Sequence, residues 1–222
     1  GKTEIKDAKH LWGLGVWATD ERIRKDLNQN SLSIDAIGEA GENLVRISSI
    51  VSDKYHIAAR GGVGAVMGSK NLKAVVVRGD EKLTLADPVR FNEIARKWQK
   101  ANMESDGGQL RSQFSTAGSL ELFHSFGDLP TRNFTTGVFP EYHKLTGQEI
   151  IKEYFHKHET CWSCSLAHNK KIRFGTPNGI EIREMPEYEC LAAWGSNIGS
   201  SDVYGATLCT DACDDHGFDS LE

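Results

Sequence analysis

In the N-terminal part of the chain, apolar residues come in short runs separated by glycine and polar residues. Runs rich in β-branched residues and bounded by glycine or asparagine predict strands, whereas an acidic turn after threonine or aspartate predicts a helix start. The run Leu72–Val77 ends in three consecutive valines and is the strongest strand prediction in the sequence. The expected elements are helices at 21–27 and 65–70 and strands at 33–37, 44–47 and 72–77.

Beyond a polar connection at 80–86, the apolar residues take a helical spacing. Asp87 suits the cap of a helix and Pro88 its first position, because the N–H that proline lacks would have no partner there. The apolar residues that follow at helical spacing are Phe91, Ile94, Ala95 and Trp98. This change of pattern predicts a domain boundary near residue 80.

Two later segments carry signals for the start or the end of a helix. Thr146–Glu149 reads as a capping box, in which the side chains of threonine and glutamate satisfy each other's backbone N–H groups. A third helix is expected from about Ser200 to Gly217, since glycine suits the residue after a helix. We therefore predict an α+β fold, with the end of a β-rich domain over 1–79 and a mainly helical domain over 80–222.

The composition excludes several classes of protein. Lys and Arg number 26 against 31 Asp and Glu, and the net charge of −5 argues against a nucleic-acid-binding protein, which would carry a basic surplus. No apolar run approaches the roughly 18 residues of a transmembrane helix, and Gly1–Asp7 lacks the apolar centre of a signal peptide. We expect a cytoplasmic protein. Because the sequence has no initiator methionine, we interpret it as an internal fragment of a longer chain.

The segment Arg60–Gly64 is a glycine-rich loop that leads into a predicted helix. Such a loop leaves backbone N–H groups available to an anion, and Arg60 could add a bidentate contact to a phosphate. The spacing Gly62-x-Gly64-x-x-x-Gly68 matches neither the dinucleotide fingerprint nor the P-loop. The alternative is a tight loop without a ligand.

All five cysteines lie after residue 160. Two of them, Cys161 and Cys164, form a C-x2-C-x3-H motif with His168. A C-x2-C pair alone occurs in zinc, iron–sulfur and dithiol redox sites. The histidine favours a metal site. His156 and His158 could also be ligands, although a solvated position is the simpler interpretation.

The other three cysteines give weaker indications. Cys209 and Cys213 lie four apart on one face of the third predicted helix, where we interpret them as small buried apolar residues. Cys190 follows the charged segment Pro186–Glu189 and precedes an apolar run, which suggests a polar site at the edge of a core.

Taken together, several segments resemble the tungsten-pterin aldehyde:ferredoxin oxidoreductases. The longest is Ala59–Ala74, which contains the glycine-rich loop. The end of the chain, Asp214–Asp219, is similar to the pterin-contacting D-x-x-G-L-(C/D) motif of that family, with Phe218 in place of leucine. The shorter segments, in family order, are Leu11–Gly13, Gly41–Arg46, Leu129–Phe134 and Pro186–Glu189.

The resemblance implies a tungsten ion held by two pterins, a [4Fe–4S] cluster beside one pterin, and Mg²⁺ bridging the pterin phosphates. Residues 1–79 would be the C-terminal part of the tungstopterin-binding N-terminal domain. Residues 80–222 would be the first part of the helical iron–sulfur and pterin-binding domain. The cofactor-binding residues implied in this way are Arg60, Gly61, Gly62, Gly64, Asp214, Gly217, Phe218 and Asp219.

The resemblance also places Cys161 and Cys164 on the cluster, with His168 where the family has its third cysteine. The fourth cluster ligand and the second pterin motif would lie beyond Glu222, so we expect the fragment to be inactive by itself. An imidazole ligand at His168 could raise the cluster potential, as in Rieske centres. Alternatively, His168 turns away and another residue serves.

A second departure lies at Glu189-Cys190, where the family has threonine after a glutamate that faces the tungsten. A thiolate there could become a tungsten ligand, since soft sulfur suits such a site. This change, together with the segment Cys161–His168, resembles the dearomatising branch, the class II benzoyl-coenzyme A reductases of anaerobic aromatic degradation. That branch reduces the ring of an aryl-CoA thioester with electrons from ferredoxin or iron–sulfur subunits, within an oligomer. Glu121 and His124 could relay the protons, or form a solvated helix edge.

Two other interpretations compete with ring reduction. The first is oxidation of aldehydes to carboxylic acids on the same scaffold, which Cys190 distinguishes from ring reduction. The second is a zinc-stapled binding module that uses Cys161, Cys164, His168 and an upstream histidine. The zinc interpretation leaves the glycine-rich segment unexplained.

Overall fold

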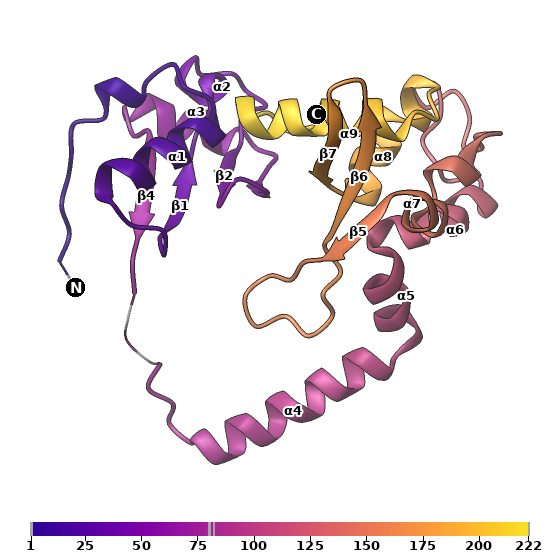
Figure 1. Ribbon diagram of the computed structural model, residues 1–222, viewed down its shortest axis with the longest axis horizontal. Helices are drawn as coiled ribbons and strands as arrows, with labels where there is room; N and C mark the ends of the chain where they lie inside the picture. Colours follow the sequence, from indigo (N-terminus) through magenta and orange to yellow (C-terminus); the bar gives the residue numbers. More distant parts are fainter. Residues whose placement is uncertain (1, 80, 82, 222) are drawn as a thin grey trace. The chain divides into compact units, whose positions relative to one another are not determined.

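The computed structural model describes residues 2–79, 81 and 83–221, and its contacts divide the chain into two compact units (Figure 1). The first unit comprises Gly1–Glu81 together with Asp211–Glu222, and the second comprises Lys82–Thr210. The C-terminal segment therefore belongs to the same unit as the glycine-rich loop. The cofactor-binding roles assigned to 1–79 and 80–222 stay predictions.

The first unit contains a four-stranded antiparallel sheet with the strand order β3-β2-β1-β4. Strand β1 lies inside the sheet, where Ile34 pairs with Val76 of β4 and Ala36 pairs with Val51 of β2. The elements of this unit before its C-terminal segment are the 3-10 helix η1 (Lys9–Leu11), α1 (Val16–Leu27), β1 (Ser33–Ala36), α2 (Glu39–Glu42), β2 (Ile50–Ser52), β3 (His56–Ala58), α3 (Val63–Ser69) and β4 (Ala74–Val77).

Helix α1 begins five residues before the predicted start at Glu21, because its cap comes from the other end of the sequence. The N-cap residue Gly15 has no side chain to accept a hydrogen bond. Oδ1 of Asp215 instead accepts from the N–H of Trp17 at 2.8 Å. A carboxylate in that position satisfies a free helix N–H and complements the helix dipole.

The strand predicted over 44–47 is wrong. Leu44 has a φ of 58°, and the N–H of Val45 donates back to the carbonyl of Ala40, so the segment is a turn that follows α2. Gly41 lies in α2, where a Cβ atom would come within 3.0 Å of the carbonyl oxygen of Gly64. The glycine therefore serves the close approach of α2 to α3.

The second unit combines helices with a three-stranded antiparallel sheet of order β5-β6-β7. Its core consists of thirteen buried residues, among them Leu120, Leu145, Ile172 and Leu191. Its elements are α4 (Pro88–Glu104), α5 (Asp106–Phe114), η2 (Thr116–Ser119), α6 (Leu120–Ser125), η3 (Tyr142–Leu145), α7 (Gly147–Tyr154), β5 (Phe155–His158), β6 (Lys170–Thr176), β7 (Gly179–Glu184), α8 (Tyr188–Trp194) and η4 (Ser196–Ile198). Helix α9 (Val203–His216) starts in this unit, and its last residues belong to the first.

The locally encoded helix boundaries are confirmed. Asp87 accepts from the N–H of Arg90 at 3.0 Å at the start of α4, and Thr146 accepts from the N–H of Glu149 at 3.3 Å at the start of α7. Only this half of the predicted capping box forms, because the N–H of Thr146 donates to the carbonyl of His143 and the carboxylate of Glu149 accepts from Lys152. Gly217 follows α9 with a φ of 77°. The α+β class is confirmed as well, although the sequence did not indicate the sheet of the second unit. None of the helices in the described residues combines the length and hydrophobicity that crossing a bilayer would need.

Candidate cofactor site

The glycine-rich loop makes a left-handed turn, with φ values of 59°, 80° and 67° at Arg60, Gly61 and Gly62. A Cβ atom on Gly62 would lie 2.5 Å from the carbonyl oxygen of Arg46, whereas a Cβ atom on Gly61 would meet nothing within 4 Å. Gly64 is as closely packed as Gly62, with Ser49 as its neighbour. Two of the three glycines are therefore required by packing, and Gly61 leaves open space.

The backbone N–H groups of this loop differ in their hydrogen bonding. The N–H of Gly64 donates to the carbonyl of Ser48 at 3.1 Å. Within the described part of the chain, the N–H groups of Gly61, Gly62 and Val63 have no acceptor. Free N–H groups on a turn beside an arginine fit an anionic group such as a phosphate.

The C-terminal segment is hydrogen-bonded to the loop that precedes β2. The N–H of Ser49 donates to the carbonyl of Gly217, and the N–H of Asp219 donates to the carbonyl of Ile47, both at 2.8 Å. This pairing brings the buried carboxylate of Asp219 to 3.8 Å from Nε of Arg60. Arg60 and Asp219, which the resemblance assigns to the same pterin, are thus close in the structure although they are far apart in the sequence.

The remaining residues of the C-terminal motif have different surroundings. Asp214 is buried and Phe218 half-buried, whereas Asp215 caps α1 and His216 lies 3.2 Å from Glu39. Oδ1 of Asp219 accepts from a backbone N–H at 2.8 Å, while its buried Oδ2 has no hydrogen-bond partner among the described residues. A buried, unbonded carboxylate oxygen near an arginine fits a bound polar group or cation.

A buried ion pair that the sequence did not indicate supports this unit. Lys73 is fully buried, and its Nζ atom lies 2.5 Å from Oε1 of Glu42 and 2.7 Å from the carbonyl of Leu14. Glu42 also accepts from the N–H of Gly13 at 2.8 Å. Glu42 therefore joins the short segments Leu11–Gly13 and Gly41–Arg46, which carry the resemblance, and Lys73 neutralises its charge.

The cysteine motif lies on the loop between β5 and β6. Cys161 and Cys164 are free and half-buried, and the N–H of Cys164 donates to the carbonyl of Cys161 at 3.1 Å. Nδ2 of Asn169 lies 3.7 Å from Sγ of Cys161, where it can donate to a thiolate. The motif therefore offers two thiolates on one turn, with a hydrogen-bond donor to the first.

No three His, Cys, Asp or Glu side chains among the described residues converge on a point that would hold one metal ion. This arrangement gives no support to the single-zinc interpretation. An iron–sulfur cluster makes a different demand, since it binds each ligand at a separate iron atom. The thiols of Cys161 and Cys164 fit that demand.

His168 contacts a glutamate that the sequence did not single out as functional. Its Nε2 atom lies 3.3 Å from Oε1 of Glu187, and the hydroxyl of Thr116 donates to Oε2 of the same carboxylate. Burial by itself raises the pKa of Glu187, but the hydrogen bonds from His168 and Thr116 outweigh it and lower the pKa. Glu187 is therefore ionised at neutral pH.

The carboxylate predicted at Glu189 is exposed, and Cys190 beside it is half-buried on α8. Of the pair on α6, Glu121 is exposed, whereas His124 stacks on Tyr142 with ring centroids 3.8 Å apart. The N–H of Phe139 donates to Nδ1 of His124 at 3.2 Å. The structure does not join Glu121 and His124 by a hydrogen bond, and the roles of Glu121, His124, Glu189 and Cys190 stay predictions.

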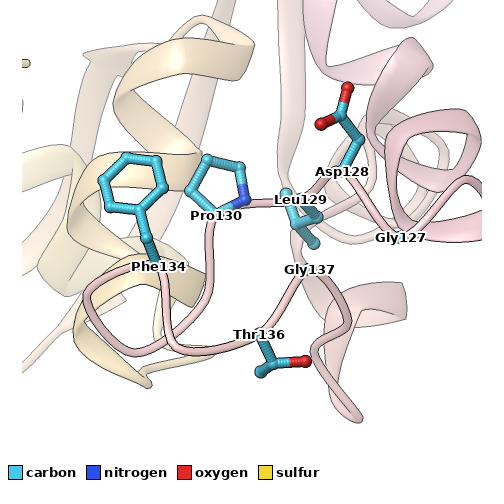
Figure 2. A pocket seen from close by; sticks show the side chains of 7 residues that line it. All are labelled: Gly127, Asp128, Leu129, Pro130, Phe134, Thr136 and Gly137. Atoms are coloured by element: carbon cyan, nitrogen blue, oxygen red, sulfur yellow. The ribbon is translucent and has the colours of Figure 1, made fainter.

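A hollow of about 350 Å³ lies beside the segment Leu129–Phe134 (Figure 2). Arg132, Asn133 and Phe134 are all left-handed, and the N–H of Asn133 donates to the carbonyl of Asn197 at 2.7 Å. Figure 2 shows Asp128 and Thr136 directed away from each other. The lining has no converging polar groups, so it offers no second site for chemistry.

Comparison with known proteins identifies the family. The model of the aldehyde ferredoxin oxidoreductase N-terminal domain matches residues 1–79, and the model of domains 2 and 3 matches residues 93–222. Tungsten-containing aldehyde ferredoxin oxidoreductases of Thermococcus kodakarensis and Pyrococcus furiosus are each 36% identical over 219 residues, which is 98% of this chain and 36% of the relative. The aliphatic sulfonate oxidoreductase, WOR-like subunit, of Pyrococcus furiosus is 28% identical over 237 residues, covering 98% of this chain and 37% of that protein.

A solved structure is also similar to this chain. The active site complex BamBC of benzoyl coenzyme A reductase, in complex with 1,5-dienoyl-CoA, is similar with a TM-score of 0.72 and 26% identity. The likeness covers 99% of this chain and 34% of that one. The chain thus spans about a third of the length of the relatives it matches. The chain belongs to the aldehyde ferredoxin oxidoreductase family.

Proposed function

We propose that the intact protein is a tungsten-pterin oxidoreductase that reduces the ring of benzoyl-CoA or a related aryl-CoA to a cyclic diene. The observation that carries this proposal is Cys190, a half-buried thiol beside Glu189 at the start of α8. The likeness to the benzoyl coenzyme A reductase complex supports it. Ring reduction takes two electrons and two protons per substrate, and the tungsten centre would deliver the electrons.

In this proposal the first unit binds the pterin. The free N–H groups of Gly61 and Gly62 and the guanidinium of Arg60 would hold the pterin phosphate and its Mg²⁺ ion. Gly64 keeps the loop against Ser49, and the segment Asp214–Asp219, including Gly217 and Phe218, lies on the pterin ring. The distance of 3.8 Å between Arg60 and Asp219 supports one common site.

In the second unit, the cysteine loop holds one side of a [4Fe–4S] cluster through Cys161 and Cys164. Electrons reach this cluster from ferredoxin or from iron–sulfur subunits, and we propose an oligomeric, cytoplasmic enzyme. His124 and Glu121 supply protons to the ring, and Glu189 faces the reacting centre. The stacking of the half-buried His124 on Tyr142 fixes the imidazole, which supports a role in directed proton transfer.

The test uses the full-length protein, produced without oxygen and loaded with tungsten. With benzoyl-CoA and a low-potential reductant, the enzyme is expected to form dienoyl-CoA. X-ray absorption at tungsten is expected to show a sulfur contribution that Cys190→Ser removes and the control Cys209→Ser keeps. Failure to reduce any aryl-CoA, with an unchanged sulfur contribution in Cys190→Ser, would overturn the proposal.

The second candidate is oxidation of an aldehyde to a carboxylic acid, with water as the oxygen source and two electrons passed to ferredoxin. It is favoured by the identity of 36% to two tungsten-containing aldehyde ferredoxin oxidoreductases, higher than the 26% to the benzoyl coenzyme A reductase complex. The same preparation assayed with aldehydes and an oxidised viologen dye distinguishes the two. Aldehyde oxidation without aryl-CoA reduction would establish this candidate.

A further inference from the structure

The imidazole of His168 is held through one of its two nitrogens. Nε2 lies 3.3 Å from Oε1 of Glu187, whereas Nδ1 has no hydrogen-bond partner in the described part of the chain. A neutral imidazole that donates through Nε2 carries its free electron pair on Nδ1. Nδ1 is therefore the atom available to a metal.

The groups behind Glu187 determine which of its oxygens faces His168. The N–H of Tyr188 donates to Oγ1 of Thr116 at 2.8 Å, so the hydroxyl of Thr116 is left to donate to Oε2 of Glu187. The carboxylate is then an acceptor at both oxygens. With Oε2 accepting from Thr116, Oε1 is the oxygen that faces Nε2 of His168, and the tautomer with its proton on Nε2 satisfies this contact.

The backbone at His168 is held by a buried lysine. Nζ of Lys170 donates to the carbonyl of Ala167 at 2.9 Å and to the carbonyl of His168 at 2.8 Å. Ala167 takes a left-handed conformation with a φ of 48°. Lys170 thus fixes the main chain at the position where Glu187 fixes the ring.

We propose that His168 binds the iron–sulfur cluster through Nδ1, with Glu187 and Lys170 as positioning residues. This inference rests on the proposed function, because it requires a cluster at Cys161 and Cys164. Histidine ligands of metals commonly donate their second ring N–H to a carboxylate, which fixes the tautomer and the ring orientation. A neutral imidazole in place of an anionic thiolate gives the cluster a higher reduction potential.

The direct test is electron paramagnetic resonance with nitrogen hyperfine spectroscopy on the reduced, full-length protein. A strongly coupled nitrogen is expected on the cluster signal. Histidine labelled with ¹⁵N at Nδ1 is expected to change that coupling, and label at Nε2 to leave it unchanged. A cluster signal without a coupled nitrogen, or a response to the Nε2 label, would overturn the inference.

Variants give a second readout that does not depend on activity. His168→Cys is expected to retain the iron, lose the nitrogen coupling and lower the reduction potential. Glu187→Gln is expected to keep the coupling, because an amide oxygen can still accept from Nε2, and to raise the potential by removing a negative charge. Glu153→Gln, an exposed glutamate on α7, is the control and is expected to leave the potential unchanged. An equal potential in Glu187→Gln and the parent protein would contradict the role of Glu187.

The outcomes separate this inference from the proposed function. Absence of iron in the full-length protein, with Cys161→Ser unchanged in its spectra, would remove the cluster and both proposals with it. Iron that depends on Cys161, together with a cluster lacking nitrogen coupling, would leave the proposed function intact and remove the role of His168 alone.

Discussion

The two units bury different kinds of side chain. In the first, a cluster of seven buried apolar residues lies beside buried charged groups such as Lys73, Asp20 and Asp219. In the second, thirteen buried apolar residues form the core, and the pair of His168 and Glu187 is partly exposed. Among the described residues, the first unit thus buries five charged side chains and the second only Lys170, so polar interactions contribute more to the first unit. Two of them, at Lys73 and Asp219, connect segments that carry the family resemblance.

The largest effect on stability is expected at Lys73. Lys73→Met leaves the buried carboxylate of Glu42 without its cation, and breaking a buried ion pair in this way costs about 3–5 kcal/mol. Hydrogen exchange should show faster opening at the amides of β1 and β4, with those of β6 unchanged. The double variant with Glu42→Gln removes both charges and should recover most of the loss. A loss below about 1 kcal/mol in Lys73→Met would show that the first unit does not depend on this pair.

A somewhat smaller effect is expected in the apolar core of the second unit. Leu120 is fully buried there, and Leu120→Ala removes packed methyl groups at a cost of about 2–5 kcal/mol. Denaturant unfolding followed by circular dichroism measures the loss, and hydrogen exchange assigns it to β6 and β7. Leu122→Ala provides the matched control, since Leu122 lies two residues away on the same helix and is exposed. Equal losses in the two variants would contradict the assignment of Leu120 to the core.

The comparison of the units also explains how much the sequence predicts. The caps at Asp87 and Thr146 and the glycine at Gly217 were predictable, because each signal lies within a few residues of the helix end that it forms. The cap at Asp215 was not, since the residue lies 198 positions from the N–H that it satisfies. The same holds for the ion pair of Lys73, whose partner is 31 residues away.

The candidate site shows the same division. The cysteine motif and the glycine-rich loop are contiguous in sequence, and both could be located without a structure. The partner of His168 could not, because the strands β6 and β7 separate His168 from Glu187 in the sequence, and only their pairing brings the two side chains together. Strand β6 contains charged residues between its buried residues, so it has no continuous apolar run that would predict a strand. Its buried residues Ile172 and Phe174 nevertheless follow the alternation expected of a strand.

An intermediate effect is expected at Asp215, which joins the C-terminal segment to the first helix. Asp215→Ala removes the acceptor for the N–H of Trp17, and loss of such a cap costs about 0.5–2 kcal/mol. Asp215→Asn keeps an acceptor oxygen and should lose less. The measurement is the free energy of unfolding, with hydrogen exchange at the first turn of α1. If Asp215→Ala and Asp215→Asn were equally stable, the hydrogen bond from Trp17 would not be what determines the start of α1.

The smallest effect is expected on α4, where the apolar stripe predicted from the sequence is exposed. Phe91 is 54% exposed and Trp98 is 66% exposed, so neither contributes to the core of the second unit. Because an exposed side chain far from a structural feature has little influence on folding, Trp98→Gln should change the free energy of unfolding by less than about 0.5 kcal/mol. Asp87→Ala, on the same helix, removes a real cap and should cost about 1 kcal/mol, which shows that the measurement can detect changes in α4. If Trp98→Gln lowered the free energy of unfolding more than Asp87→Ala, the apolar stripe of α4 would be packed against protein in solution. The contrast between a buried core and an exposed helix in the second unit would then not hold.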